Sequence, residues 1–218
     1  MDVSKAVLSR KSTRAFLDTP ISNSLLADLL KKASRAPSGG NLQPWKVFVI
    51  NESSMKAFLK FQEDWNEPEK TSYDIYPKNL KEPYRTSRYE VGEQMYSILG
   101  ISRDDKVARV NQVMKNFKFF GAPAAIFCYV DKQMGPPQWS DLGMFLQTFM
   151  LLATEVGLDT FAQEAWSIKE TSVSSFFNIQ HENDILFCGI SIGYADKKDP
   201  LAEMRTSRRP LEEWAYFY

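Results

Sequence analysis

The sequence predicts an α/β arrangement, in which helices pack on a β-sheet. Apolar residues recur at helical spacing from Leu25 to Ala33, whereas residues 46–50 and 124–130 are short apolar runs typical of buried strands. Helical and extended patterns alternate along the chain, which is the third observation behind this prediction. With 218 residues, 44% of them hydrophobic, the chain is long enough to bury a core of its own.

Six helices and four strands are expected. In the first helix, residues 2–9, Val3, Ala6 and Val7 share one face. The second helix can be capped by Ser22 or Asn23, and Pro37 marks its end. The other expected helices cover residues 53–66, 104–118, 141–156 and 169–177, and the expected strands cover residues 46–50, 124–130, 158–163 and 185–193.

Three segments depart from this regular pattern. Residues 141–156 are apolar on nearly every face, so we expect this helix to be surrounded by protein and shared between subunits. Residues 67–89 combine three prolines with several tyrosines and arginines, which indicates an irregular cap. The aromatic tail, residues 214–218, is too apolar to remain in water and is expected to pack on the fold or on a partner chain.

Composition excludes several classes of protein. The 27 basic and 27 acidic residues cancel, so no overall field attracts nucleic acid or an anionic membrane, and neither is an expected partner. The N-terminus lacks an apolar signal core, and no stretch reaches the roughly 20 apolar residues that a membrane helix needs. Cys128 and Cys188 lie in apolar runs and are predicted to be buried free thiols. We therefore expect a soluble cytoplasmic protein.

A single histidine limits the chemistry. His181 lies in a polar stretch that resembles a solvated turn, which leaves no oriented imidazole for a Ser-His-Asp triad. The chain has no Cys-x-x-Cys motif and no pair of histidines, so no metal site is expected.

Two basic segments stand out against the neutral total. Residues 1–17 and 197–209 each carry three net positive charges, and Ser12 and Thr13 lie among the basic residues of the first segment. Forked guanidinium donors together with hydroxyl groups suit a phosphate. Two separate solvated surfaces would explain the same charges, and the sequence leaves both interpretations open.

The loop at residues 37–45 is the second candidate for binding. Its small residues allow a ligand to approach the backbone, and the amides of Asn41 and Gln43 can both donate and accept hydrogen bonds, as a planar heterocycle with an imide edge requires. An ordinary turn between a helix and a strand uses the same residue types.

Taken in order, the motifs resemble the FMN-dependent nitroreductase family. They are Arg10–Phe16, Ala36–Trp45, Phe119–Pro123, Gly157–Ala165, Gly189–Asp196 and Arg205–Glu213. The segment at residues 88–101 is most similar to the nitrobenzoate-reductase branch. The resemblance implies an α+β fold with a central mixed, mainly antiparallel β-sheet flanked by helices. It also implies one domain over residues 1–218, with a cap at 67–96, a C-terminal arm at 200–218, and an interlocked homodimer that holds FMN at the subunit interface.

Carried over by position, the resemblance assigns roles to individual residues. It implies that Arg14 tunes the flavin electronically from the pyrimidine edge and that the segment at 162–165 lies over the ring, although Ala162 and Ala165 replace the usual Pro and Gly. The implied phosphate contacts are Arg10, Lys11, Ser12, Arg205 and Arg208. The implied contacts to the ring or ribityl chain are Pro37, Ser38, Gly39, Asn41 and Gln43 from the partner subunit, and Asn116, Ala162, Gln163, Glu164 and Ala165.

The implied activity is ping-pong hydride transfer through flavin N5 from NADH or NADPH to a nitroaromatic, or a related aromatic or quinone acceptor. No side chain is required as a catalytic residue, because the flavin carries the chemistry. Tyr84 and Arg88 are candidates for binding a small aromatic substrate. Two alternatives remain: reductive dehalogenation of halophenols, since Ala36–Gly39 resembles the deiodinase turn and Lys81, Glu82 and Tyr84 occur in the cap, and a non-catalytic flavin-binding sensor.

Overall fold

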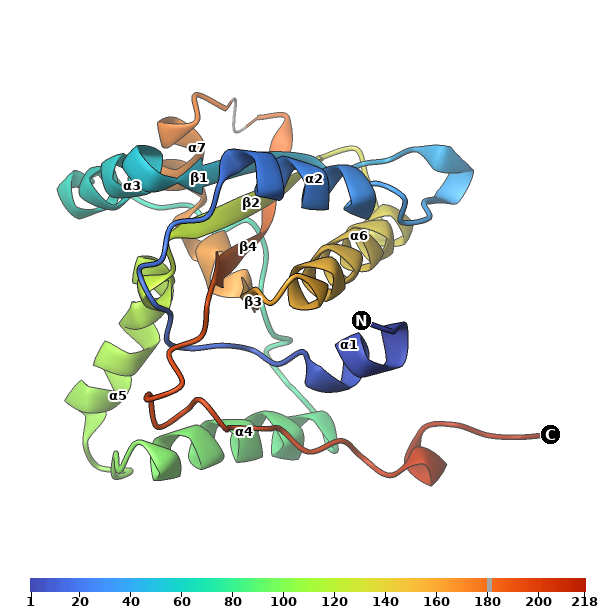
Figure 1. Ribbon diagram of the computed structural model, residues 1–218. Helices are drawn as coiled ribbons and strands as arrows, with labels where there is room; N and C mark the ends of the chain where they lie inside the picture. The colour runs from blue at the N-terminus through green and yellow to red at the C-terminus, as the bar shows by residue number, and fades with distance from the viewer. Residues whose placement is uncertain (180–181) are drawn as a thin grey trace.

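The computed structural model describes residues 1–179 and 182–218 and contains a four-stranded antiparallel sheet with helices on both faces (Figure 1). The strands are β1 (Lys46–Asn51), β2 (Ala124–Asp131), β3 (Asp159–Gln163) and β4 (Asp184–Gly193), in the order β1-β2-β4-β3. Every neighbouring pair of these strands is antiparallel. The α/β arrangement expected from element alternation is therefore wrong, and the α+β class is confirmed. In addition to these strand pairs, an isolated parallel bridge joins Ser12 to Thr160 of β3.

The central strand β2 separates two hydrophobic cores. Its even-numbered residues, such as Ile126, pack against α2 (Asn23–Ala33) and α6 (Pro136–Glu155), whereas odd-numbered ones such as Phe127 pack against α3 (Glu52–Asp64) and α7 (Glu170–Phe176). Side chains alternate between the two faces of a strand, so a strand covered on both faces is apolar throughout. This explains why residues 124–130 form an unbroken apolar run.

The central helix α6 is longer than predicted and not fully covered. It begins at Pro136, because proline fits the first turn of a helix, rather than at Asp141. Its inward face is buried, but Met144 is 39% exposed within the chain. Because α6 is apolar on nearly every face and this chain covers only its inward face, an apolar strip at Met144 remains exposed.

The helix expected over residues 104–118 ends early. Helix α5 (Lys106–Met114) gives way to a 3₁₀ segment, Lys115–Gly121, in which Phe119 and Phe120 adopt positive φ angles of 50° and 53°. Such angles are unfavourable for bulky residues. Packing offsets the cost of this backbone conformation, because the fully buried Phe119 ring stacks on Trp166 with centroids 4.7 Å apart.

The segment predicted to be an irregular cap contains a long helix. After Pro83 the chain forms α4 (Tyr84–Ile98), which has no buried residue and lies apart from the sheet (Figure 1). The expectation of irregular structure over residues 67–89 is therefore wrong from Tyr84 onward. Because α4 contributes no buried apolar face, its sequence lacks the periodicity by which helices are recognised. The Gln94 side chain of α4 donates a hydrogen bond to the Arg205 carbonyl at 2.9 Å, which ties α4 to the C-terminal segment.

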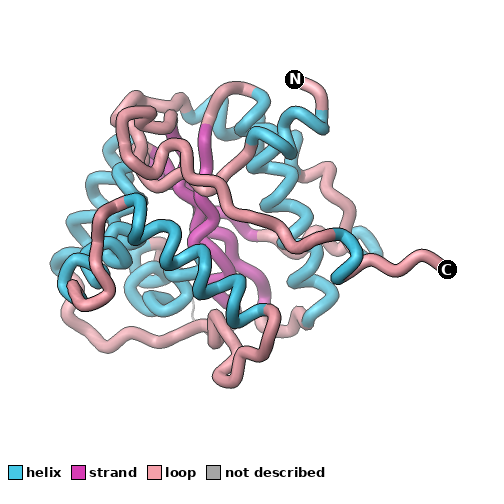
Figure 2. The backbone as a smooth tube through the Cα atoms, turned by 90° about the horizontal axis from the view of Figure 1, so that it is seen from below, coloured by secondary structure: helices cyan, strands magenta, loops and turns pink. Residues whose placement is uncertain are grey.

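Both ends of the chain expose apolar side chains. Figure 2 shows the C-terminal tail extending away from the body, and Tyr216 and Phe217 are 71% and 87% exposed. In α1 (Val3–Ser9), Val3 and Leu8 are 76% and 74% exposed. The tail does not pack on its own chain. Of the two expected packing partners, only a partner chain remains.

The two cysteines are buried and free, as predicted. Burial raises the pKa of both thiols, so they remain protonated and unreactive. The predicted turn at His181 lies outside the described residues. Among the helices that the structure describes, none is long and apolar enough to cross a membrane.

Candidate functional site

The two basic segments meet at one small cavity. The Thr13 amide donates to the Thr160 carbonyl at 3.1 Å, so residues 12–13 run beside β3 and present the basic side chains to the C-terminal segment. The cavity has a volume of about 90 Å³. It is lined by Arg10, Lys11, Ser12, Arg14, Met204, Arg205, Thr206 and Arg208. All five residues that the sequence assigned to a phosphate therefore lie together, although almost 200 positions separate the two segments.

Hydrogen bonds to backbone carbonyls hold these cations in place. Arg205 donates to the carbonyls of Leu8 at 2.7 Å and Ser9 at 2.8 Å, which fixes the C-terminal segment to the end of α1. Lys11 donates to the Ala202 carbonyl. Arg208 donates to the hydroxyl of Thr206 at 2.8 Å, a local contact at the surface. The positive charges are thus positioned by neutral acceptors.

The cluster lacks a counterion of its own. In the described part of the chain, no carboxylate forms an ion pair with Arg10, Lys11, Arg205 or Arg208. Burial, and then the nearby charges of Arg208 and Arg205, lower the pKa of Arg10. Cations that repel one another around a cavity favour a bound anion, which would relieve that repulsion.

A second cavity, of about 320 Å³, has the amide-rich lining of a ring-binding site. Ala162, Gln163, Glu164 and Ala165 come from the end of β3 and the turn after it, and Asn116 faces them from the segment after α5. The buried Gln163 side chain accepts from the Ser191 hydroxyl and donates to the Asn116 carbonyl at 2.8 Å. This network fixes the wall of the cavity. Glu164 is exposed, yet partial desolvation by the surrounding protein raises the pKa of its carboxyl.

Arg14 connects the cavities. Its side chain lines the small basic cavity, the 320 Å³ cavity and a third, larger one. The guanidinium carbon lies 4.8 Å from the centre of the Phe161 ring, and the group donates to the Ser12 carbonyl at 3.3 Å. Burial lowers the pKa of Arg14, and no described carboxylate forms an ion pair with it. An unneutralised, partly buried positive charge therefore stands where the three cavities meet.

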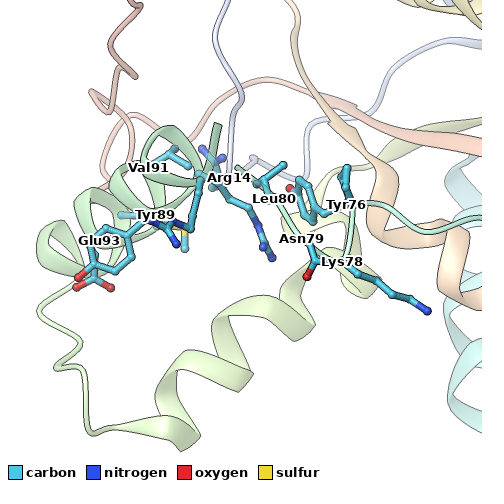
Figure 3. Close-up of a pocket in the computed structure, with 13 residues that line it drawn as sticks. Arg14, Tyr76, Lys78, Asn79, Leu80, Tyr89, Val91 and Glu93 are labelled. Atoms are coloured by element: carbon cyan, nitrogen blue, oxygen red, sulfur yellow. The ribbon is translucent and has the colours of Figure 1, made fainter. Parts of the chain in front are cut away.

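The third cavity, of about 740 Å³, opens between α4 and the chain at residues 76–80 (Figure 3). Figure 3 shows Tyr89 and Glu93 on the side of α4 and Tyr76 on the opposite side, with Arg14 between them. The Arg88 guanidinium lies 3.9 Å from the centre of the Tyr76 ring. Arg88, a candidate for binding substrate, thus lines a cavity with aromatic walls.

Tyr84 does not line this cavity. It is 60% exposed, and its ring faces Arg209 at 5.7 Å. Lys81 and Glu82 are exposed as well, and Glu82 forms an ion pair with Arg85 at 2.6 Å. The three residues that a deiodinase-like site would use are therefore not gathered around a ligand cavity in this chain.

The loop after α2 lies on the side of the protein away from α4 and α5 (Figure 1). The amide of Gly39 donates to the Asp141 carboxylate at 3.2 Å, which holds the loop against the start of α6. None of the predicted contacts from this loop lines the three cavities that Arg14 joins. These residues are Pro37, Ser38, Gly39, Asn41 and Gln43. Within one chain they are not brought together with the basic cluster.

Seven residues that line the 320 Å³ cavity were not among the predicted site residues: Ile75, Tyr76, Met95, Gln112, Val113, Phe120 and Phe161. Tyr76 and Phe161 supply aromatic surface, and Gln112 supplies a side-chain amide. Gln112 is 4% exposed and is the buried residue of α5. Its signal in the sequence is faint: a glutamine one helical turn before Asn116, on the face that turns inward.

Comparison with known proteins identifies the family. Residues 7–194 match the Nitroreductase family, so the chain belongs to that family. It is 32% identical to a 4-nitrobenzoate reductase of Pseudomonas putida over 99% of this chain and 95% of the relative. It is 33% identical to a nitrobenzene nitroreductase of Ectopseudomonas oleovorans over 97% of this chain and 94% of the relative.

A solved structure has nearly the same fold. The crystal structure of an FMN and NADPH-dependent nitroreductase from Sphigopyxis sp. strain HMH matches with a TM-score of 0.94 and 39% identity, covering 100% of this chain and 99% of that one. The family resemblance inferred from the sequence motifs is confirmed.

Proposed function

We propose that this protein is an FMN-dependent NAD(P)H oxidoreductase that reduces nitroaromatic acceptors. The observation that carries the proposal is the position of Arg14, which joins a phosphate-sized basic cavity, a cavity lined by amides and aromatic rings, and a larger open cavity. Those are the three spaces that a flavin phosphate, a flavin ring and an exchanging substrate require. The named activities of the relatives support the same class.

The residues present fit FMN. A cluster of cations that forms no ion pair with a described carboxylate, in which burial and then the charges of Arg208 and Arg205 lower the pKa of Arg10, suits a dianionic phosphate. The 320 Å³ cavity offers amides to the polar edge of the ring and aromatic surface to its apolar part. Arg10, Lys11, Ser12, Arg205 and Arg208 would hold the phosphate, and the segment at 162–165 would face the ring.

The protein positions the reactants and sets the electrostatics. When bound, FMN supplies the redox chemistry, taking two electrons as hydride from NADH or NADPH and passing them to the acceptor. Arg14 places a positive charge beside the ring, which favours the reduced flavin with its added negative charge. Because no described carboxylate forms an ion pair with Arg14, that charge would be available to the ring. No side chain is required as a nucleophile.

The larger cavity suits an aromatic acceptor that carries an acidic group. Tyr76 and Tyr89 line it and can stack on a flat ring. The guanidinium of Arg88, held over Tyr76 and not paired with a described carboxylate, can bind a carboxylate. We therefore propose that nitrobenzoates, with the carboxylate toward Arg88, are better acceptors than neutral nitrobenzene.

We further propose that the active unit is a homodimer. The exposed side chains of Val3, Leu8 and Phe217 at the chain ends, together with the uncovered strip at Met144, supply apolar area for a partner. The loop at residues 37–43 reaches none of the three cavities of its own chain, so it would complete the flavin site of the other subunit. Analytical ultracentrifugation should give about twice the 25.0 kDa chain mass.

Steady-state assays test the proposed reaction. The FMN-loaded protein should oxidise NADH or NADPH when 4-nitrobenzoate is present, and mass spectrometry should identify the reduced nitrogen product. Halide release from a halophenol without nitro reduction would favour the dehalogenase alternative. Tight FMN binding with no nucleotide oxidation would instead favour the sensor.

A further inference from the structure

The connection between α3 and α4 is fastened to the start of α7. The Glu69 carboxylate accepts a hydrogen bond from the Ser172 amide at 3.1 Å and lies 3.8 Å from the Lys169 ammonium. The Glu170 amide donates to the Lys70 carbonyl at 3.2 Å. Backbone amides in the first turn of a helix have no partner within the helix, and α7 receives no side-chain hydrogen bond from its own N-cap. The connection therefore satisfies two of these amides.

The next residues of the connection extend this attachment. The Ser72 amide donates to the Ser167 carbonyl at 2.8 Å, in the 3₁₀ segment after β3. The Tyr73 hydroxyl donates to the Phe187 carbonyl of β4. We call residues 69–73 the anchor, because they join the connection to the turn after β3, to β4 and to α7.

The chain directly after the anchor forms one wall of the two larger cavities. Tyr76 lines both of them, and residues 78–80 line the 740 Å³ cavity across from α4 (Figure 3). No hydrogen bond joins residues 74–80 to another part of the chain that the structure describes. The Arg88 guanidinium of α4 lies over the Tyr76 ring, but α4 itself has no buried residue. The position of Tyr76 therefore depends on the anchor.

We infer that Glu69 is a positioning residue for the aromatic acceptor: its carboxylate holds the anchor on α7, and the anchor holds Tyr76 where the acceptor ring can stack. Tyr76 lies three positions after Tyr73, so a displaced anchor displaces the wall. A site that adopts its binding arrangement for only part of the time binds its ligand more weakly by that fraction. This inference rests on the proposed function, because it concerns the acceptor of that reaction.

Steady-state kinetics of the FMN-loaded protein test this role. Glu69→Ala should raise the KM for 4-nitrobenzoate roughly 3- to 10-fold and leave kcat within about 2-fold, because saturating acceptor restores the binding arrangement. Glu67→Ala is the first control, since Glu67 is exposed and carries the same charge two positions earlier. Ser22→Ala is the second control. It removes the hydroxyl that caps α2 by accepting from the Leu25 amide at 3.2 Å, and Ser22 does not line the three cavities. Both controls should leave KM within about 2-fold.

Two further variants show whether Glu69 acts through Tyr76. Tyr76→Leu alone should raise the KM for 4-nitrobenzoate, and adding Glu69→Ala to it should raise KM no further, because the wall then has no aromatic ring to position. Glu69→Gln keeps an oxygen for the Ser172 amide but loses the ion pair with Lys169, so its KM should lie between those of wild type and Glu69→Ala. If Glu69→Ala does not fold, Glu69→Gln replaces it, and a wild-type KM in that variant then refutes the inference.

Hydrogen–deuterium exchange gives a readout that is independent of turnover. In wild type the Lys70 amide donates to the Thr171 hydroxyl at 2.9 Å, and the Ser72 amide donates to the 3₁₀ segment after β3. Both amides should exchange faster in Glu69→Ala than in wild type, because loss of the carboxylate lets the anchor open more often. Neither control should show this change.

Three results would overturn the inference. An unchanged KM in Glu69→Ala would do so, even with faster exchange at the anchor. An equal rise of KM in Ser22→Ala would mean that lost stability, and not lost positioning, weakens acceptor binding. A further rise of KM when Glu69→Ala is added to Tyr76→Leu would show that Glu69 does not act through Tyr76. If wild type itself fails to reduce 4-nitrobenzoate, the proposed function fails and the inference with it, whereas normal turnover in wild type and the same KM in Glu69→Ala refutes the inference alone.

Discussion

Replacing Arg208 with alanine probes the basic cluster most selectively. Arg205 and Lys11 also bond to backbone carbonyls and so hold the C-terminal segment in place, whereas Arg208 bonds locally to Thr206 and Ser207. Its removal should therefore affect the bound anion more than the fold.

The size of the effect follows from two opposing contributions. A charge-assisted hydrogen bond contributes roughly 1.5–3 kcal/mol. Arg208 is exposed, and it repels Arg10, so its loss relieves a repulsion that exists before the phosphate binds. Both facts favour the lower end of the range, about 1.5 kcal/mol, which corresponds to a roughly 10-fold higher FMN dissociation constant.

Fluorescence titration of the apoproteins measures this change. Arg209→Ala is the matched control, because Arg209 lies next in sequence, forms an ion pair with Glu213 at 4.0 Å and does not line the basic cavity. The difference between the two variants should shrink at high salt, which screens an exposed charge. Arg208→Ala with the same FMN affinity as Arg209→Ala would refute the phosphate assignment, and a much lower apoprotein Tm would mean that Arg208 supports the fold.

Three further predictions concern stability and reactivity. Gly193→Ala should lower the unfolding free energy by roughly 1–3 kcal/mol in urea, since an added Cβ would lie 2.8 Å from Phe16 Cδ1; an unchanged midpoint would contradict the tight packing. Partial desolvation raises the pKa of Glu164 above its ordinary 4.5, so ionisation at about pH 8 opposes folding, and Glu164→Gln should raise the Tm there by roughly 1–2 °C. That gain should vanish below about pH 4, where the carboxyl is protonated in both states; a gain that persists would point to another cause. Cys128 and Cys188 should resist a thiol reagent in the native protein and react in denaturant, and rapid native labelling would show that the sheet opens.

Local patterns predicted the elements that bury a regular apolar face. The run at residues 124–130 marked a strand covered on both sides, and the leucine periodicity before Pro37 marked α2. Helix α4 was not predicted, because it has no buried residue and its sequence therefore has no apolar stripe. The helix predicted at 104–118 was too long because α5 ends at Met114, where a 3₁₀ segment begins that leads to the buried Phe119; no local pattern records this change.

The candidate site could be predicted only in part from the sequence. Charge at the two chain ends was compatible with a phosphate site or with two solvated surfaces, and the family resemblance assigned the phosphate. The structure places Arg10 and Arg208 around one cavity. The two basic segments come together because distant strands pair in the order β1-β2-β4-β3, and no local sequence pattern specifies that pairing. Gln112 was missed because the burial of a single glutamine depends on tertiary packing.

The central claim is that this chain holds FMN and cycles it between a nucleotide and a nitroaromatic. An anaerobic absorbance spectrum of the FMN-loaded protein, recorded before and after NADH, NADPH and then 4-nitrobenzoate, tests it most directly. The account predicts that the flavin bands bleach with at least one nucleotide and return with the nitroaromatic. A protein that takes up no FMN, or whose flavin bands never bleach, would contradict it.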